Sequence, residues 1–269
     1  MECEVTVVIP VYNREAYIAD ALDSILSQTM QAWKVLIVDD ASTDKTAEKI
    51  APYLADERIQ YRKNRENRGV GKTLDKALAL VDTPYFVIVD SDDWLEKDAL
   101  ETLLAEMKRQ PPSTSLVCGN AQVWQEKEGV LERKGLMRHR SFADKYDFLL
   151  YGPMLTPRFF RTEAVRRVKG FLADDLSGGR YNEDRYLLLR LIATSRFHHV
   201  DKLLYNIRLH GDNLTKKANQ GKFNETKKDF IESLMRKWGD EYRPVFYKTP
   251  DGWLDVERLV PTELVGAGR

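Results

Sequence analysis

Apolar positions along the first 110 residues repeat with two different periods. Short β-branched runs such as Val5–Val11 and Val35–Val38 predict buried strands. Between them, Ala16–Leu26 places apolar side chains three and four positions apart, which is the spacing of one helical face. Because parallel strands need crossover helices, the alternation predicts an α/β fold with a mostly parallel, Rossmann-like sheet and helices on both faces. The same periods predict helices over Thr46–Leu54, Leu74–Val81 and Ala99–Met107, and strands over Ile59–Tyr61 and Tyr85–Val89.

The pattern changes after Pro111-Pro112, where two strands are predicted around a polar turn at residues 126–129. The segment Lys216–Lys228 is polar and basic with little periodicity, and this predicts a loop. A last helix is expected over Asn224–Trp238, before a frayed Gly-Ala-Gly-Arg end. We therefore expect an α/β half over 1–110, a second half of the same domain over 111–215, and a basic loop with a C-terminal helical extension over 216–269.

Composition places the chain among globular proteins, since 43% of its residues are hydrophobic and 31% are charged. No apolar run approaches the ~20 residues of a membrane helix, so neither a transmembrane span nor a signal peptide is expected. The two cysteines, Cys3 and Cys118, lie far apart without neighbouring histidines. This spacing supports neither a disulfide framework nor a zinc site, and it favours a reducing, cytoplasmic location.

Charge is balanced over the whole chain, with 42 basic and 42 acidic residues, so the strongly basic composition of nucleic-acid-binding proteins is absent. Residues 132–237, however, contain 23 Lys and Arg against 13 Asp and Glu. Such an excess favours an anionic ligand, an anionic acceptor or peripheral association with an anionic membrane at its inner face. A solvated surface is the common alternative for scattered charge.

Polar residues directly follow three of the predicted strands, at Pro10–Arg14, Asp39–Asp44 and Asp90–Asp93. Ligands of open parallel sheets bind beyond these carboxyl ends. If the last strand continued, Asp90 and Asp92 would face the same side and could share one cation, and oxygen ligands suit Mg²⁺ or Mn²⁺. A single acidic residue could instead cap the helix expected near Leu95, but three carboxylates exceed that need.

Five ordered motifs give a resemblance to a known family. Over about residues 4–125 the chain resembles the family 2 glycosyltransferases of GT-A fold, and the resemblance continues more weakly to His210-Gly211-Asp212-Asn213. It implies a metal-dependent, inverting enzyme that moves a sugar from a nucleotide diphosphate donor, a UDP-sugar, to an acceptor hydroxyl. The motifs are Val7–Asn13 (VVIPVYN), Ser27–Thr29 (SQT), Val38–Asp44 (VDDASTD), Asn67–Gly69 (NRG) and Val89–Asp93 (VDSDD).

The resemblance also implies roles for single residues. Pro10 and Tyr12 would line the base pocket, and Asp40 would accept a hydrogen bond from a uracil-like imide. Asp92 and His210 would contact the Mn²⁺ or Mg²⁺ ion on the diphosphate. The remaining residues implied for the donor site are Asn13, Arg14, Asn67, Gly69, Asp90 and Ser91, with Asp90 on the ribose and a metal-bound water.

One departure from the family concerns the segment Thr73-Leu74-Asp75, where members commonly have Ala-Arg-Asn. The arginine is missing, so its contact with base or phosphate must come from elsewhere, for which Lys72 and Arg68 are the nearest candidates.

Glu183 and Asp184 form a second acidic constellation, after Asn182 and at the start of an apolar segment. An N-cap and favourable charges in the first helical turn would account for all three residues without chemistry. The resemblance instead implies that Asp184 is the catalytic base, with residues 1–110 binding the donor and 111–215 the acceptor. A sugar nucleotidyltransferase is the first alternative, although Pro10–Arg14 contains no glycine for a phosphate loop; a non-catalytic nucleotide- or carbohydrate-binding module is the second.

Overall fold

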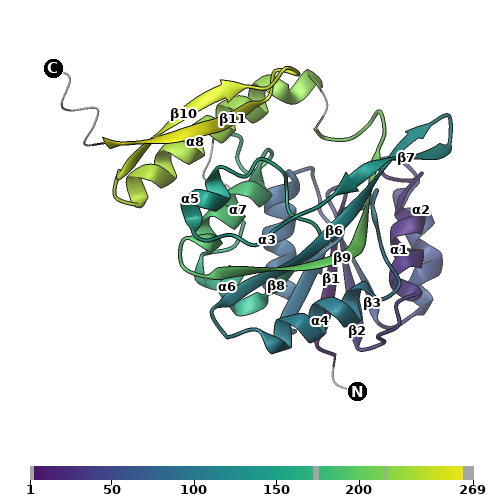
Figure 1. The fold of residues 1–269 in the computed structure, drawn as a ribbon. Coiled ribbons are helices and arrows are strands. Elements are labelled where there is room, and N and C mark those ends of the chain that lie inside the picture. The colour runs from purple at the N-terminus through teal and green to yellow at the C-terminus, as the bar shows by residue number, and fades with distance from the viewer. Residues whose placement is uncertain (1–2, 172–175, 216, 263–269) are drawn as a thin grey trace.

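The computed structural model describes residues 3–171, 176–215 and 217–262, and within them the main sheet has nine strands (Figure 1). Its first half is parallel, in the order β3-β2-β1-β4. This confirms the predicted α/β class. The bounds are β1 (Val5–Val11), β2 (Trp33–Asp39), β3 (Ile59–Lys63) and β4 (Tyr85–Ile88).

The second half of the sheet continues from β4 through β8, β6, β9 and β5, with β7 paired to β6. Strand β8 runs antiparallel to both β4 and β6, and β9 is again parallel to β6. Both predicted halves therefore share one sheet. The bounds are β5 (Trp94–Leu95), β6 (Thr114–Lys127), β7 (Val130–Met137), β8 (Arg158–Arg161) and β9 (Arg196–Leu209).

Helices cover both faces of the sheet, as the continuous apolar strands predict. Along β1, Val7 and Ile9 pack into the hydrophobic cluster under α1 and α4, whereas Val8 packs into the cluster under α3 and α7. Alternate side chains point to opposite faces, so a strand buried on both sides must be apolar throughout. The bounds are α1 (Ile18–Leu26), α2 (Thr46–Ile50) with η1 (Ala51–Ala55), α3 (Val70–Leu80), α4 (Ala99–Arg109), α5 (Lys145–Leu149), α6 (Thr162–Arg167) and α7 (Glu183–Ile192).

The C-terminal segment differs from its prediction. A short 3-10 turn, η2 (Lys217–Asn219), leads into α8 (Gln220–Lys237), so the expected loop over 216–228 is wrong; Lys216 itself lies outside the described residues. Strands β10 (Tyr242–Lys248) and β11 (Leu254–Pro261) then form an antiparallel hairpin that was not predicted.

Figure 1 shows α8 and the hairpin lying together beyond α5 and α7. Phe230, Ile231 and Leu234 of α8 belong to the same buried cluster as α3 and α7, so this unit packs onto the main core. The expected frayed end at 266–269 lies outside the described residues. Within the part of the chain that is described, no helix combines the length and apolar character that a membrane span requires.

Candidate active site

A cavity of about 990 Å³ opens at the carboxyl ends of β1, β2 and β4. This is where ligands of open α/β sheets bind, and the volume suits a small-molecule ligand. The walls come from all three segments of the chain: the strand ends of the first half, the region before α7, and the C-terminal unit.

Most residues implicated by sequence meet in this cavity. Lys72 does not, since it is exposed on α3 and is absent from the lining; His210 also lies outside the lining, with only 3% of its side chain exposed behind Asp92. The candidates that line the cavity are Pro10, Tyr12, Asn13, Arg14, Asp40, Asn67, Gly69, Asp90, Ser91, Asp92 and Asp184.

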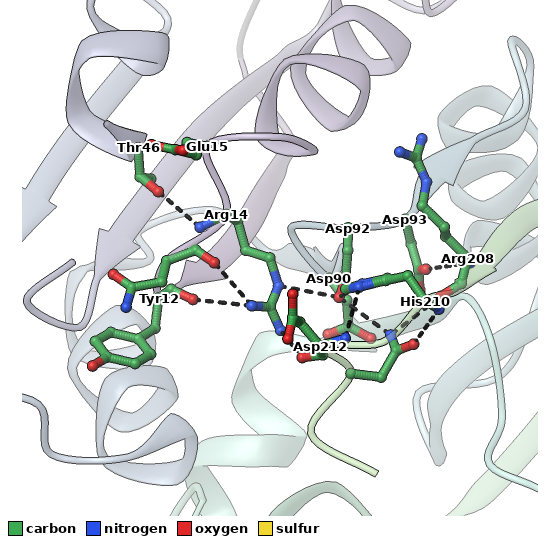
Figure 2. Close-up of polar contacts among 12 residues, drawn as sticks. Tyr12, Arg14, Glu15, Thr46, Asp90, Asp92, Asp93, Arg208, His210 and Asp212 are labelled. Carbon is green, nitrogen blue, oxygen red and sulfur yellow. Dashed lines mark hydrogen bonds and ion pairs between the residues drawn. The ribbon is translucent and has the colours of Figure 1, made fainter. Parts of the chain in front are cut away.

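Asp92 lies at the centre of a polar cluster (Figure 2). Its Oδ2 is 2.9 Å from His210 Nε2, 3.2 Å from Arg14 Nε and 3.4 Å from Asn213 Nδ2. Burial opposes ionisation of Asp92, but the hydrogen bond from His210 and the charge of Arg14 outweigh it and lower the pKa of this carboxyl. Asp92 is therefore a carboxylate at neutral pH.

The Asp90–Asp93 segment is a turn and not a continued strand, because β4 ends at Ile88 and Asp93 N–H donates to the Asp90 carbonyl at 3.0 Å. The helix expected to begin near Leu95 is α4, which begins at Ala99. Asp93 points inward and accepts a hydrogen bond from Arg208 N–H at 2.8 Å. Burial, with Asp92 and Asp90 nearby, raises its pKa well above the ordinary value. Asp93 thus fixes β9 to the turn that carries Asp90 and Asp92.

Asp92 and His210 offer a carboxylate oxygen and an imidazole nitrogen, which are ligand types that suit Mn²⁺. In this structure the two atoms are hydrogen-bonded to each other at 2.9 Å. Within the described ranges, no cluster of three or more His, Cys, Asp or Glu side chains is arranged to hold a metal. Further ligands would be water and donor phosphates, which is how proteins commonly bind Mg²⁺.

Arg158 joins two further acidic residues of the cavity, Asp90 and Asp184. Its Nη2 donates to both oxygens of Asp90, at 2.9 and 3.1 Å, and its Nη1 donates to Asp184 Oδ2 at 2.8 Å. The guanidinium is almost fully buried, with 6% of the side chain exposed. A single planar cation therefore sets the distance between Asp90, at the end of β4, and Asp184, at the start of α7. Sequence reasoning missed Arg158, although a basic residue before the apolar pair Phe159-Phe160 is an available signal.

Glu183 and Asp184 differ in environment. Burial and the adjacent charge of Asp184 raise the pKa of Glu183 well above its ordinary value. Asp184 instead pairs with Arg158, and both acidic residues line the cavity. Asn182 was expected to cap α7, but its side chain makes no capping hydrogen bond; its Nδ2 donates to the Phe223 carbonyl at 3.0 Å. This hydrogen bond joins the start of α7 to α8.

Asp40 anchors the loop that precedes α3. Its carboxylate accepts backbone N–H bonds from Arg68 at 2.9 Å and Gly69 at 2.8 Å, and a side-chain bond from Asn64 at 2.8 Å. Gly69 has a φ of 91°, and a Cβ there would lie 2.7 Å from Arg180 Cγ. Only glycine fits this position.

Arg180 is a cationic residue of the lining that sequence reasoning did not identify. Its Nη1 donates to Asn67 Oδ1 at 2.9 Å, and the residue lines the cavity beside Gly69. Neither Arg68 nor Lys72 is part of the lining. The signal for Arg180 was weak, because it follows two glycines in a segment without periodicity.

Comparisons with known proteins agree with this geometry. The family model described as glycosyl transferase family 2 matches residues 6–171. Chondroitin synthase of Escherichia coli is 30% identical over 212 residues, which is 78% of this chain but only 29% of the synthase. The chain thus spans less than a third of that relative.

Solved structures show the same fold at low identity. S. aureus TarS, solved with UDP-GlcNAc, superposes with a TM-score of 0.68 and 19% identity, over 86% of this chain and 66% of that chain. The mannosyltransferase PcManGT from Pyrobaculum calidifontis, solved with GDP-Man and Mn²⁺, gives a TM-score of 0.62 and 17% identity, over 88% of this chain and 65% of that one. With the family model matching more than half of its length, the chain belongs to glycosyl transferase family 2 and is a glycosyltransferase of GT-A fold.

Proposed function

We propose that this glycosyltransferase is metal-dependent and inverting, and that it moves a sugar from a UDP-sugar to an acceptor hydroxyl. The observation that supports this most directly is the cavity that Asp92, which is hydrogen-bonded to His210, shares with Asp184. Such a transfer needs a cation site for the leaving diphosphate and a base for the acceptor. We assign the first role to Asp92 with His210 and the second to Asp184.

The donor lies against the first half of the chain, residues 1–110. Tyr12 is 42% exposed in the lining, which leaves its ring free to stack on a base, and Pro10 lies beside it. Asp40 faces the same part of the site. The complex of S. aureus TarS with UDP-GlcNAc supports a uridine donor, and the complex of PcManGT with Mn²⁺ supports the metal.

The acceptor enters from the side of residues 111–215, where Asp184 lies. Its hydroxyl oxygen forms a bond to the anomeric carbon of the donor on the face opposite the diphosphate, as the bond from that carbon to the diphosphate oxygen breaks. Asp184 takes the hydroxyl proton. A bound Mn²⁺ or Mg²⁺ would stabilise the charge that develops on the departing diphosphate. Arg158 holds the Asp184 carboxylate in place during this displacement.

The test is slow donor hydrolysis, which needs no known acceptor. The protein is incubated with UDP-sugars, and in parallel with GDP-mannose, with Mn²⁺ or EDTA, and the free nucleotide is measured. We expect UDP release that EDTA abolishes, and an inverted anomeric configuration in the free sugar. Preferred hydrolysis of GDP-mannose would refute the uridine preference. UDP release that persists in EDTA would refute the metal, and retained configuration would refute the inverting mechanism.

A further inference from the structure

Three aromatic side chains from distant parts of the sequence form one wall of the cavity. We call Tyr181, Phe223 and Trp253 the aromatic wall. The ring centroids of Tyr181 and Phe223 are 4.8 Å apart, and those of Phe223 and Trp253 are 5.7 Å apart. All three residues line the cavity. Tyr181 precedes α7, Phe223 lies on α8 and Trp253 precedes β11. The C-terminal unit therefore completes the site.

Polar contacts fix this wall in position. Asn224 on α8 donates to the Gly252 carbonyl at 2.9 Å and accepts from Leu254 N–H at 2.8 Å, which clamps the residues on both sides of Trp253. Trp253 N–H also donates to Thr249 Oγ1 at 3.0 Å. The hydrogen bond from Asn182 to the Phe223 carbonyl ties the wall to the start of α7. The backbone that carries Phe223 and Trp253 is therefore held in place before any ligand binds.

The aromatic wall is separate from the residues assigned to the donor. Those residues lie at the ends of β1, β2 and β4, whereas the wall lies beyond residue 171, where the family model ends. Tyr181 comes three residues before Asp184, so the wall adjoins the proposed base. Asn182 and Asn219 lie in the same lining and add amide groups beside the rings.

We propose that the aromatic wall binds the acceptor, and that it does so by stacking against the apolar face of a terminal hexopyranose. This inference rests on the proposed function. A pyranose ring in its chair form has a C–H face, which packs on an aromatic ring, and hydroxyl groups at its edge, which need hydrogen-bonding partners. Rings supply large, rigid contact area at low conformational cost, and the neighbouring amides can bond the hydroxyls.

A lipid or apolar peptide is a poorer match. Phe223 is only 8% exposed, and the wall shares its cavity with charged side chains such as Arg180 and Asp184. The nucleobase of the donor is assigned to Tyr12 and Asp40, which come from the first half of the chain. A sugar ring is the ligand that combines an apolar face with a polar edge.

The test is saturation-transfer NMR with methyl β-glycosides of glucose, galactose and N-acetylglucosamine, in the presence of UDP and Mn²⁺. We expect at least one glycoside to receive saturation on the protons of one ring face. In Trp253→Leu this signal should fall at least fivefold with unchanged affinity for UDP, and Trp253→Tyr should restore it. Tyr181→Leu is a second loss variant on a different element. Tyr247→Leu is the matched control, because Tyr247 lies on the same hairpin, is 43% exposed and is not in the lining.

The outcomes separate this inference from the proposed function. If the parent protein binds UDP but none of the three glycosides, or if Trp253→Leu and Tyr181→Leu keep the full signal, the aromatic wall is not the acceptor site. A signal that Tyr247→Leu also loses would mean adventitious sugar binding. If the parent protein does not bind UDP at all, the proposed function is wrong and the inference fails with it.

Discussion

Asp92 accepts hydrogen bonds from three side chains that come from two distant parts of the chain, Arg14 on one side and His210 and Asn213 on the other. As a metal ligand it should control metal-assisted donor binding. We expect Asp92→Ala to weaken Mn²⁺-dependent UDP binding at least tenfold, about 1.4 kcal/mol, and to abolish its sensitivity to EDTA. His210→Ala should have a smaller effect, because water replaces one ligand among several.

Titration calorimetry with UDP, with and without Mn²⁺, measures both effects. Asp212→Asn is the matched control, because Asp212 lies in the same lining and bonds Arg14 only through its backbone carbonyl. Unchanged Mn²⁺-dependent affinity in Asp92→Ala would remove Asp92 from the metal site.

For Asp184, the catalytic and the structural roles give different kinetics. If Asp184 is the base, Asp184→Asn keeps the shape of the side chain but cannot accept the proton. Turnover should then fall by ~10²–10⁴ with donor affinity preserved. As a helix-start residue alone, the same change would cost only ~0.3–1 kcal/mol of stability and leave turnover nearly intact. Turnover, UDP affinity and melting temperature are measured on the same preparation.

Glu183→Gln is the control for that measurement, since the raised pKa of Glu183 favours the neutral form that glutamine resembles. This variant should retain most of the parental turnover. Equal losses in Glu183→Gln and Asp184→Asn would contradict the assignment of the base to Asp184.

At the same scale, sequence reasoning found acidic site residues better than basic ones. Asp90 and Asp92 directly follow an apolar strand, and that order fixes which edge of the sheet they occupy. Arg158 and Arg180 reach the cavity through long side chains from segments whose position depends on tertiary packing. Lys72 was placed by its nearness in sequence to a family motif, but on α3 its side chain faces away from the lining.

Among the elements, those with strong periodicity were predicted almost to their ends. Val5–Val11 was predicted in full, and the helix over Ala99–Met107 extends only two residues further. The helix α8 was half missed because its first turns, from Gln220, are polar where they border the cavity. The β10–β11 hairpin was missed since both strands are half-exposed and carry charges on both faces. Their apolar contacts form only against α8 and the core.

The segment between β7 and β8 contains a histidine that should make stability depend on pH. His139 is 5% exposed, its Nδ1 is 2.8 Å from Tyr151 Oη, and its Nε2 accepts from Thr156 N–H at 3.3 Å. Burial, with nearby His199, lowers the pKa of His139 to about 4. The unfolded chain therefore binds a proton more readily, and stability is lost as the pH falls from about 6.5 toward about 4.

We expect the free energy of unfolding to fall by roughly 1–3 kcal/mol between about pH 7.5 and about pH 5. His139→Gln should have a smaller fall over the same interval, although it is less stable at neutral pH. Urea unfolding at both pH values measures this. His198→Gln, at a half-exposed histidine beside Glu106, is the control and should keep the parental fall. A fall as large in His139→Gln as in the parent would assign the effect to other groups.

Over the whole molecule, the cavity depends on contacts between segments that the sequence separates. Its donor side comes from the first half of the sheet, its base from α7, and its aromatic wall in part from α8 and the hairpin. The C-terminal unit is fixed at this site by Asn182 and Asn224 and packs onto the cluster under α3 and α7. The geometry of the site therefore depends on the packing of the C-terminal unit against the main core.

This linkage predicts a single cooperative unfolding transition. Leu234 on α8 is 3% exposed within the cluster that includes Leu74 of α3 and Leu187 of α7. Truncating it leaves a cavity in the shared core, so Leu234→Ala should lower the free energy of unfolding of the whole chain by ~2–5 kcal/mol. Glu232→Ala, which removes an exposed ion pair with Lys228 on the same helix, should change this free energy by less than ~1 kcal/mol.

Tryptophan fluorescence and far-ultraviolet circular dichroism should report the same midpoint in each variant. If Leu234→Ala produces an early transition in one signal while the other keeps the parental midpoint, α8 and the hairpin unfold independently. A site that needs them would then be only partly formed at temperatures where the sheet is still folded.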